Sequence, residues 1–345
     1  MKPVRWLVVF LLVSITAWSL YVAMFLLQLG AHTTAEYWLY SAQAVKAHML
    51  RHNADRRKLL FVGGSSVWMG VDAGSAGQIF GARGLNLGLH GMIPLDQILE
   101  EVRPVIRADD TVVLMLEYEY YVIDTPYNAW FLNQIMVGQP DWFWNLPWMN
   151  RLQFLTSVPP FRVLEGTMTK LFADGLGIMK KRHVEQDPEK LLTPTRPPSS
   201  LPEVNYTFRN IDEDGDAIVA LGSFVTYIYP LDRAVLAQRY PWETLQAFAR
   251  YCADRGVDLY LMWPPVVKGL VNFESRLTRR NIHTITRHLA EAGIPVLGRP
   301  ADFQYDRRLF ADSGYHLIHE GRDLHTQKVV GLLREKINRG VAVVP

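Results

Sequence analysis

The sequence has little of what several protein classes require. Its 345 residues include one cysteine, Cys252, so the chain can form neither a disulfide framework nor a cysteine metal site. The net charge is only +2 and no basic stripe is interleaved with aromatic residues, so we expect no nucleic-acid partner. The histidines offer no clear metal set, because His283 and His288 are five positions apart and His316 and His319 lack a third ligand. We therefore expect no metal and no cofactor.

Charged residues are absent from positions 6–29. As a helix this segment would be roughly 36 Å long, which is enough to cross the hydrocarbon core of a bilayer. Lys2 and Arg5 precede it, whereas the stretch that follows carries only Glu36 and Lys46. The positive-inside rule then places the N-terminus in the cytoplasm. We predict a cytoplasmic tip and single-pass anchor over residues 1–30, with the rest of the chain on the other side of the membrane.

Two alternatives to an anchor stay open. Cleavage near Gly30 would make the segment a signal peptide, and a buried core helix would place it inside the fold. Residues 31–57 follow, with an amphipathic helix predicted over 37–53. We interpret this helix as a stalk.

Short apolar runs alternate with helical patterns over most of the remaining chain. The predicted strands are 59–62, 85–87, 111–116, 257–262 and 294–297. The predicted helices are 94–106, 232–255 with a break at Pro241, 270–292 and 321–338. This alternation is typical of an α/β domain with a parallel sheet. We divide the domain into a first half, 58–124, and a second half, 218–340.

Residues 125–217 interrupt the alternation. They are rich in tryptophan, phenylalanine and proline, and 193–203 form a Pro/Ser-rich stretch. We interpret the segment as an insertion whose aromatic residues would pack on the membrane surface, on a lipid chain, on a partner or on one another. Residues 210–216, NIDEDGD, resemble the start of a calcium loop, but Leu221 stands where an EF-hand closes with glutamate.

Two hydroxyl side chains stand where the first predicted strand ends. The run 59–62 stops at two glycines, and Ser65 and Ser66 follow before a helical segment. Backbone N–H groups at the start of a helix favour negative charge, so a serine placed there can attack an acyl carbon while its own N–H stabilises the oxyanion. The alternative is that one of the two serines only caps the helix.

A nucleophilic serine needs a base, and the base needs a group that orients it. Residues 310–322, FADSGYHLIHEGR, offer both just before the last predicted helix. Asp312 precedes His316 by four positions, so a loop would let the carboxylate reach the imidazole and fix its tautomer. His319 lies three positions further on.

These segments together resemble the SGNH (GDSL-like) hydrolase superfamily, and within it the membrane-anchored bacterial branch associated with O-acylation of surface polysaccharides. The resemblance implies an SGNH/flavodoxin-like three-layer domain. LLFVGGSSVWMG resembles the first block and implies Ser65 as nucleophile. NLGLHGM resembles the second block and implies Gly91 as an oxyanion-hole residue beside Ser65. DSGYHLIHEGR resembles the branch's C-terminal block and implies His316 as base and Asp312 as its partner.

The chain also departs from the family pattern. The first block usually has aspartate before the serine, where Gly64 stands here. The third block usually supplies an asparagine to the oxyanion hole, but the strand at 111–116 runs into LEYEYY, with Glu119 near that place. A carboxylate donates no hydrogen bond unless it is protonated. We therefore count Ser66, Glu119 and His319 as neighbours of the predicted site.

The resemblance implies an O-acyltransferase, most often for acetyl groups, that acts on a cell-surface polysaccharide. It implies a location in the bacterial inner (cytoplasmic) membrane with the C-terminal domain in the periplasm. It also implies a membrane-bound O-acyltransferase partner, because acyl donors such as acetyl-CoA are cytoplasmic. Two alternatives stay open: an esterase or polysaccharide deacetylase with the same triad, and a catalytically degenerate scaffold subunit.

Overall fold

The computed structural model describes residues 2–33, 35–176, 206–218, 231 and 239–341. Contacts divide the chain into two compact units. The first, which we call the helical unit, comprises Met1–Tyr37 and Tyr127–Val184. The second, the sheet unit, comprises Trp38–Pro126 and Glu185–Pro345.

The sheet unit contains five parallel strands, which confirms the predicted α/β class. They are β1 (Lys58–Gly63), β2 (Arg83–Asn86), β3 (Thr111–Met115), β4 (Asp258–Met262) and β6 (Val296–Leu297), in the order β2-β1-β3-β4-β6. Every residue of β1 and β3 is buried, which explains the apolar runs that follow Lys58 and Thr111. Two short strands, β5 (Val266–Val267) and β7 (Gln304–Tyr305), pair separately.

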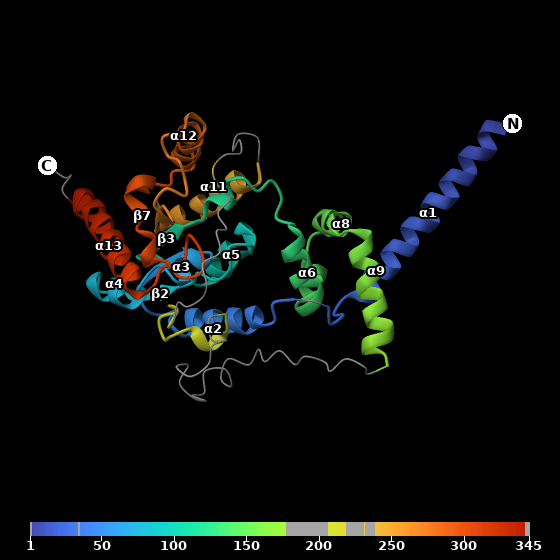
Figure 1. Ribbon diagram of the computed structural model, residues 1–345, viewed down its shortest axis with the longest axis horizontal. Coiled ribbons are helices and arrows are strands. Elements are labelled where there is room, and N and C mark those ends of the chain that lie inside the picture. Colours follow the sequence, from blue (N-terminus) through green and yellow to red (C-terminus); the bar gives the residue numbers. More distant parts are fainter. Residues whose placement is uncertain (1, 34, 177–205, 219–230, 232–238, 342–345) are drawn as a thin grey trace. The chain divides into compact units, whose positions relative to one another are not determined.

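Helices cover the sheet in two groups (Figure 1). The first group is α4 (Ala73–Ile79) and α13 (His319–Val341), which contact each other and the sheet. The second is α5 (Leu95–Val102), α11 (Tyr240–Ala253) and α12 (Arg276–Glu291), in which α11 contacts both neighbours. The strand order is that of doubly wound sheets, in which ligands bind outside the carboxyl ends of the strands where the order reverses. Here that point lies between β1 and β3.

Short helical turns connect these elements. They are α3 (Ser65–Trp68), η1 (Arg103–Val105), η2 (Tyr118–Tyr121), η5 (Phe208–Asn210), η6 (Pro300–Phe303) and η7 (Arg307–Leu309).

Two predicted helices begin later than expected. Pro241 lies in the first turn of α11, where its missing N–H leaves no helical bond unmade, so it does not break that helix. The predicted residues 232–238 lie outside the described part of the chain. The second helix, α12, begins after Ser275, because the Ser275 hydroxyl accepts the N–H of Thr278 at 3.0 Å and caps it.

The predicted stalk helix belongs to the sheet unit. It is α2 (Trp38–His52), and one face of it is buried, including Leu39, Val45 and Leu50. Lys46 is buried as well, and its ammonium donates hydrogen bonds to the carbonyls of three residues: Asn86 at 3.1 Å, Gly215 at 2.9 Å, and Gly88. Burial lowers the pKa of Lys46 to about 7. A buried cation thus ties α2 to the sheet and to the loop around Gly215.

The loop 206–218, expected to end the insertion, packs on the sheet unit. The Ala217 N–H donates to the Trp68 carbonyl at 3.1 Å, and the Asp216 carboxylate accepts from the Asn86 amide at 2.8 Å. Asp212 accepts the N–H groups of Asp214 and Asp216, both at 2.9 Å. The carboxylates of the calcium-like motif are therefore engaged with protein donors.

The helical unit contains the apolar N-terminal helix and most of the described insertion. Its elements are α1 (Lys2–Gln28), α6 (Ala129–Gly138), α7 (Pro140–Asn145), α8 (Trp148–Ser157), α9 (Pro160–Met168) and the π-helical turn η3 (Thr169–Asp174). Over Pro3–Gln28 the mean hydropathy is 2.2, so α1 is long and apolar enough to span a membrane. The Pro/Ser-rich stretch at 193–203 lies outside the described residues.

Candidate active site

Ser65 lies at the carboxyl end of β1, beside the reversal point of the sheet. β1 ends at Gly63, and Ser65 is the first residue of the four-residue helix α3. The residue before it, Gly64, has φ −88° and ψ −148° and makes no side-chain cap. Neither serine caps the helix, because Gly64 is its N-cap residue, and Ser66 is buried in the first turn.

The three residues predicted to be catalytic form one hydrogen-bonded chain. Ser65 Oγ lies 2.7 Å from His316 Nε2, and His316 Nδ1 lies 2.7 Å from Asp312 Oδ1. Because residues 312–316 fold into a compact loop, in which the Ala311 N–H donates to the His316 carbonyl at 2.8 Å, a four-residue spacing brings the carboxylate onto the ring. The order nucleophile, base and orienting carboxylate is the geometry that activates a serine.

The carboxylate of Asp312 has a second partner that the sequence did not indicate. The Tyr206 O–H donates to Asp312 Oδ2, and the same oxygen of Tyr206 lies 3.4 Å from His316 Nδ1. Burial alone would raise the pKa of Asp312, but the hydrogen bond and charge of His316 and the hydrogen bond from Tyr206 bring that pKa below its usual value. Asp312 is therefore held ionised, as a residue that stabilises an imidazolium must be.

Aromatic rings surround this side of the triad. Trp38 stacks on Trp68 with ring centroids 5.6 Å apart, and Tyr206 lies 5.7 Å from Trp38 and 6.3 Å from Trp68. Trp68 belongs to α3 and Trp38 is the first residue of α2. These two helices and the loop that carries Tyr206 therefore share one aromatic cluster.

Residues 64–66 form the turn that carries Ser65, and we call it the nucleophile turn. The acidic residue that contacts it is Glu117. Its carboxylate accepts the N–H groups of Gly64 at 3.1 Å and Ser66 at 2.8 Å, on either side of Ser65. Glu119, expected near this place, instead accepts the O–H of Tyr315 at 3.0 Å. Burial raises the pKa of Glu117, although the two amide hydrogen bonds oppose that shift. Sequence reasoning missed Glu117 because it stands two positions before the expected one.

The same carboxylate leaves space only for glycine at position 64. A Cβ on Gly64 would lie 2.5 Å and 2.7 Å from the two oxygens of Glu117, and 2.7 Å from Cα of Gly91. All three distances are shorter than real Cβ contacts, so a side chain at this position would force its neighbours to move. The same measurement places the loop of Gly91 directly against the nucleophile turn.

The two amides predicted to form an oxyanion hole are available. Within the described part of the chain, neither the Ser65 N–H nor the Gly91 N–H donates a hydrogen bond. The other predicted neighbour, His319, begins α13, and its Nδ1 lies 2.8 Å from the Arg322 guanidinium. His319 thus interacts with its own helix rather than with the triad.

Comparison with known proteins adds no family to this geometry. No model of a protein family matches the chain, and no curated protein matches it.

Proposed function

We propose that the chain is a membrane-anchored serine O-acyltransferase of SGNH type that acts on a cell-surface polysaccharide. The observation that carries this proposal is the hydrogen-bonded chain from Ser65 through His316 to Asp312. Its position at the carboxyl edge of a parallel sheet, beside the reversal in strand order, is where such folds bind ligands. The resemblance of three sequence blocks to the SGNH superfamily adds to it.

The proposed reaction has two steps. His316 Nε2 takes the proton of Ser65 Oγ as Oγ attacks the acyl carbonyl, and the amides of Ser65 and Gly91 stabilise the resulting oxyanion. The bond from the acyl carbon to the leaving oxygen breaks, and His316 returns its proton to that oxygen. In the second step His316 deprotonates a sugar hydroxyl, whose oxygen attacks the acyl carbon. The bond from that carbon to Ser65 Oγ then breaks, and His316 returns the proton to Oγ.

The proposed location follows from α1 and its flanks. The helix is apolar over Pro3–Gln28, and Lys2 and Arg5 lie at its N-terminal end. By the positive-inside rule the sheet unit would face the periplasm of a bacterial inner membrane. Because activated acyl donors are made in the cytoplasm, the proposal includes a membrane-bound O-acyltransferase partner that passes the acyl group outward.

Hydrolysis by the same triad is the second candidate. An esterase or polysaccharide deacetylase differs only in the second step, where water rather than a sugar attacks the acyl-enzyme. The geometry of the triad fits both reactions, and an assay of the products distinguishes them. With p-nitrophenyl acetate as donor, a transferase forms acetylated oligosaccharide when an acceptor is added, whereas an esterase forms acetate whether or not the acceptor is present.

A covalent probe tests the activated serine itself. The full chain in detergent is treated with a fluorophosphonate and its intact mass is measured. We expect a single adduct in the wild type and in Ser66→Ala, which keeps the neighbouring turn without the second hydroxyl, and none in Ser65→Ala or His316→Ala. A folded wild type that forms no adduct would overturn the enzyme proposal and leave the scaffold alternative.

A further inference from the structure

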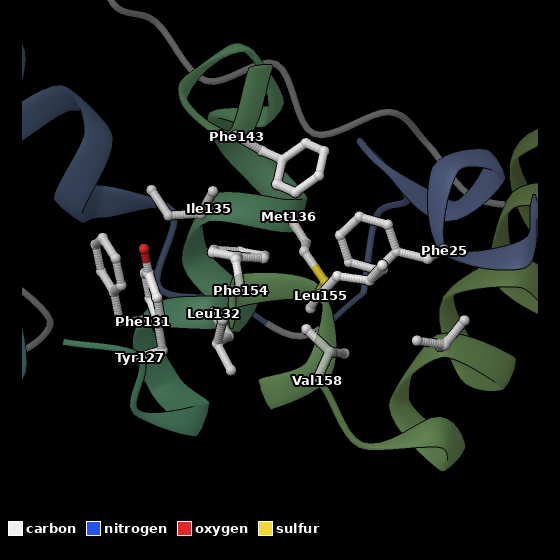
Figure 2. Packing of buried hydrophobic residues seen from close by; sticks show 11 residues of the cluster. Phe25, Tyr127, Phe131, Leu132, Ile135, Met136, Phe143, Phe154, Leu155 and Val158 are labelled. Carbon is white, nitrogen blue, oxygen red and sulfur yellow. The ribbon is translucent and has the colours of Figure 1, made fainter. Parts of the chain in front are cut away.

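The end of α1 is enclosed by the helical unit rather than projecting freely from it. Phe25 is fully buried in an aromatic cluster with Phe143 and Phe154, with ring centroids 5.1 Å and 6.2 Å away (Figure 2). The Tyr21 hydroxyl donates to the carbonyls of Leu155 and Val158, both at 2.8 Å. The residues of α1 before Tyr21 are exposed, so only the last two turns of the helix have protein around them.

The α9 helix packs directly on this end of α1. The Thr167 hydroxyl lies 3.2 Å from the Met24 carbonyl, and the Lys170 ammonium lies 3.3 Å from the Leu29 carbonyl. A Cβ on Gly166 would lie 2.2 Å from the Gln28 side chain, so a glycine allows this close approach. One face of α9 is therefore committed to α1.

Another face of α9 and η3 is apolar and exposed. We call it the outer stripe, and its residues are Phe161, Leu164, Met168, Leu171 and Phe172. Their spacing of three or four positions, with one adjacent pair, is that of a single helix face. Phe161 is 78% exposed, more than any other large apolar side chain in the described residues.

Helices α7 and α8 add exposed aromatic surface to the same unit. Trp148 is 72% exposed, and Trp144, Met149 and Leu152 are exposed as well. The Arg151 guanidinium of α8 folds back onto the carbonyls of Leu146 and Trp144 and over the Trp144 ring.

The basic group of α9 is likewise turned inward. The Arg162 guanidinium donates to Asn133 at 2.7 Å, to Gln28 at 3.2 Å and to Thr33 at 2.6 Å. A soluble surface helix normally directs such a group to water. Here it joins α9 to the segment that leaves α1, and it lies 3.9 Å from the carboxylate of Glu165, the exposed charged residue at the edge of the outer stripe.

We propose that the outer stripe lies in the outer interfacial layer of the lipid bilayer that α1 crosses. This rests on the proposed membrane placement of α1. If the hydrocarbon core begins at Trp6, its thickness of about 30 Å ends after about 20 helical residues, near Phe25. That is the level at which Met24 and Leu29 contact α9 and η3. The lipid that covers the exposed length of α1 is continuous with the stripe.

The chemistry of the unit suits this layer. Tryptophan is enriched at the boundary between hydrocarbon and headgroups, and helices that lie in the interface bury an apolar face by roughly 5–10 Å. The helical unit would therefore fix the depth of the chain in the bilayer, in addition to the anchoring by α1.

Site-directed spin labelling of the full chain tests this placement. Single cysteines are introduced at Phe161, Leu164, Met168 and Phe172, and the chain is reconstituted in vesicles of phosphatidylethanolamine and phosphatidylglycerol. The native Cys252 is buried and stays unlabelled. Collision rates of the label with oxygen, which concentrates in lipid, are compared with those of a water-soluble nickel chelate.

Two positions calibrate the measurement. Val13→Cys reports the middle of α1, and Gln327→Cys reports an exposed site on α13. We expect the ratio of oxygen to nickel collisions at the stripe to rise several-fold over that at Gln327, toward that at Val13. A ratio like that of Gln327 overturns the inference, and protection from both reagents overturns it in favour of a protein contact. A water-like ratio at Val13 would instead refute the membrane placement itself.

Discussion

Replacing Glu117 by glutamine tests whether the buried carboxylate holds the nucleophile turn in place. The carboxylate accepts two backbone N–H groups, from Gly64 and Ser66, at 3.1 Å and 2.8 Å. In the glutamine variant the side-chain oxygen still accepts one of these two backbone N–H groups. The side-chain NH₂ group faces the other N–H, so that two donors oppose each other. A buried amide without an acceptor costs about 1–3 kcal/mol in the free energy of unfolding. Glu117→Ala leaves both amides unpaired and should cost about 2–6 kcal/mol.

The effect on reactivity is expected to exceed the effect on folding. Both amides flank Ser65, so their release lets the turn shift, and a displacement of about 1 Å at a reacting group can lower the rate by about 10²-fold. We expect Glu117→Gln to react with a fluorophosphonate about 10- to 100-fold more slowly than the wild type at a temperature where circular dichroism shows it folded. Glu119→Gln is the matched control, because its oxygen still accepts the Tyr315 hydroxyl.

The sign of the pH dependence provides a second readout. Burial raises the pKa of Glu117, so the folded chain binds this proton more tightly than the unfolded chain does. Stability from this group is then present at low pH and is lost as pH rises from the unfolded pKa, about 4.3, through the raised one. Because glutamine does not titrate, the stability gap between the wild type and Glu117→Gln should shift in the variant's favour as pH rises. A variant that reacts like Glu119→Gln and shows a constant gap would refute the positioning role.

Four further substitutions probe the same site. Gly64→Ala should destabilise the fold by about 1–3 kcal/mol in denaturant unfolding, because its Cβ overlaps the Glu117 oxygens, whereas Gly91→Ala, whose nearest neighbour is 3.7 Å away, should be tolerated. Tyr206→Phe removes a donor to Asp312 and should move the acidic limb of the pH profile of fluorophosphonate labelling to higher pH; an unmoved limb would contradict the assigned hydrogen bond. Asp312 has a lowered pKa, so its stabilisation is present above the unfolded pKa and lost as pH falls through the folded one; Asp312→Asn should lose less stability on acidification, which thermal unfolding across pH measures.

Local signals were sufficient for the sheet and for the triad. The strands β1 and β3 are buried on both faces, so after their first residues, Lys58 and Thr111, their sequences are apolar and can be recognised without knowledge of their neighbours. Ser65 stands two positions after the end of β1, and Asp312 and His316 lie in one short loop. The nucleophile and the Asp–His pair can therefore each be recognised from a few neighbouring residues. The sequence could not show that the two halves meet at 2.7 Å, but the edge of a parallel sheet made that expectation reasonable.

Features that depend on distant contacts were not predictable. Lys46 looked like the polar side of a stalk, yet three backbone carbonyls from two other segments bury its ammonium. Tyr206 follows a segment with no strand or helix pattern, and only the fold brings its hydroxyl to Asp312. The choice between Glu117 and Glu119 depends on where β3 ends, at Met115, and on the 3₁₀ turn that then directs the two side chains to different partners.

Gly64 and the Glu117 carboxylate depend on each other sterically. An aspartate before the serine would place its side chain where the Glu117 carboxylate lies, since even a Cβ on Gly64 comes within 2.5 Å of it. The turn can hold an acid at position 64 or accept one from the neighbouring strand, but not both. The carboxylate that contacts this turn comes from Glu117, two residues after the end of β3, whereas Glu119 accepts the Tyr315 hydroxyl. The glycine and the glutamate therefore support each other, and neither by itself argues for a degenerate site.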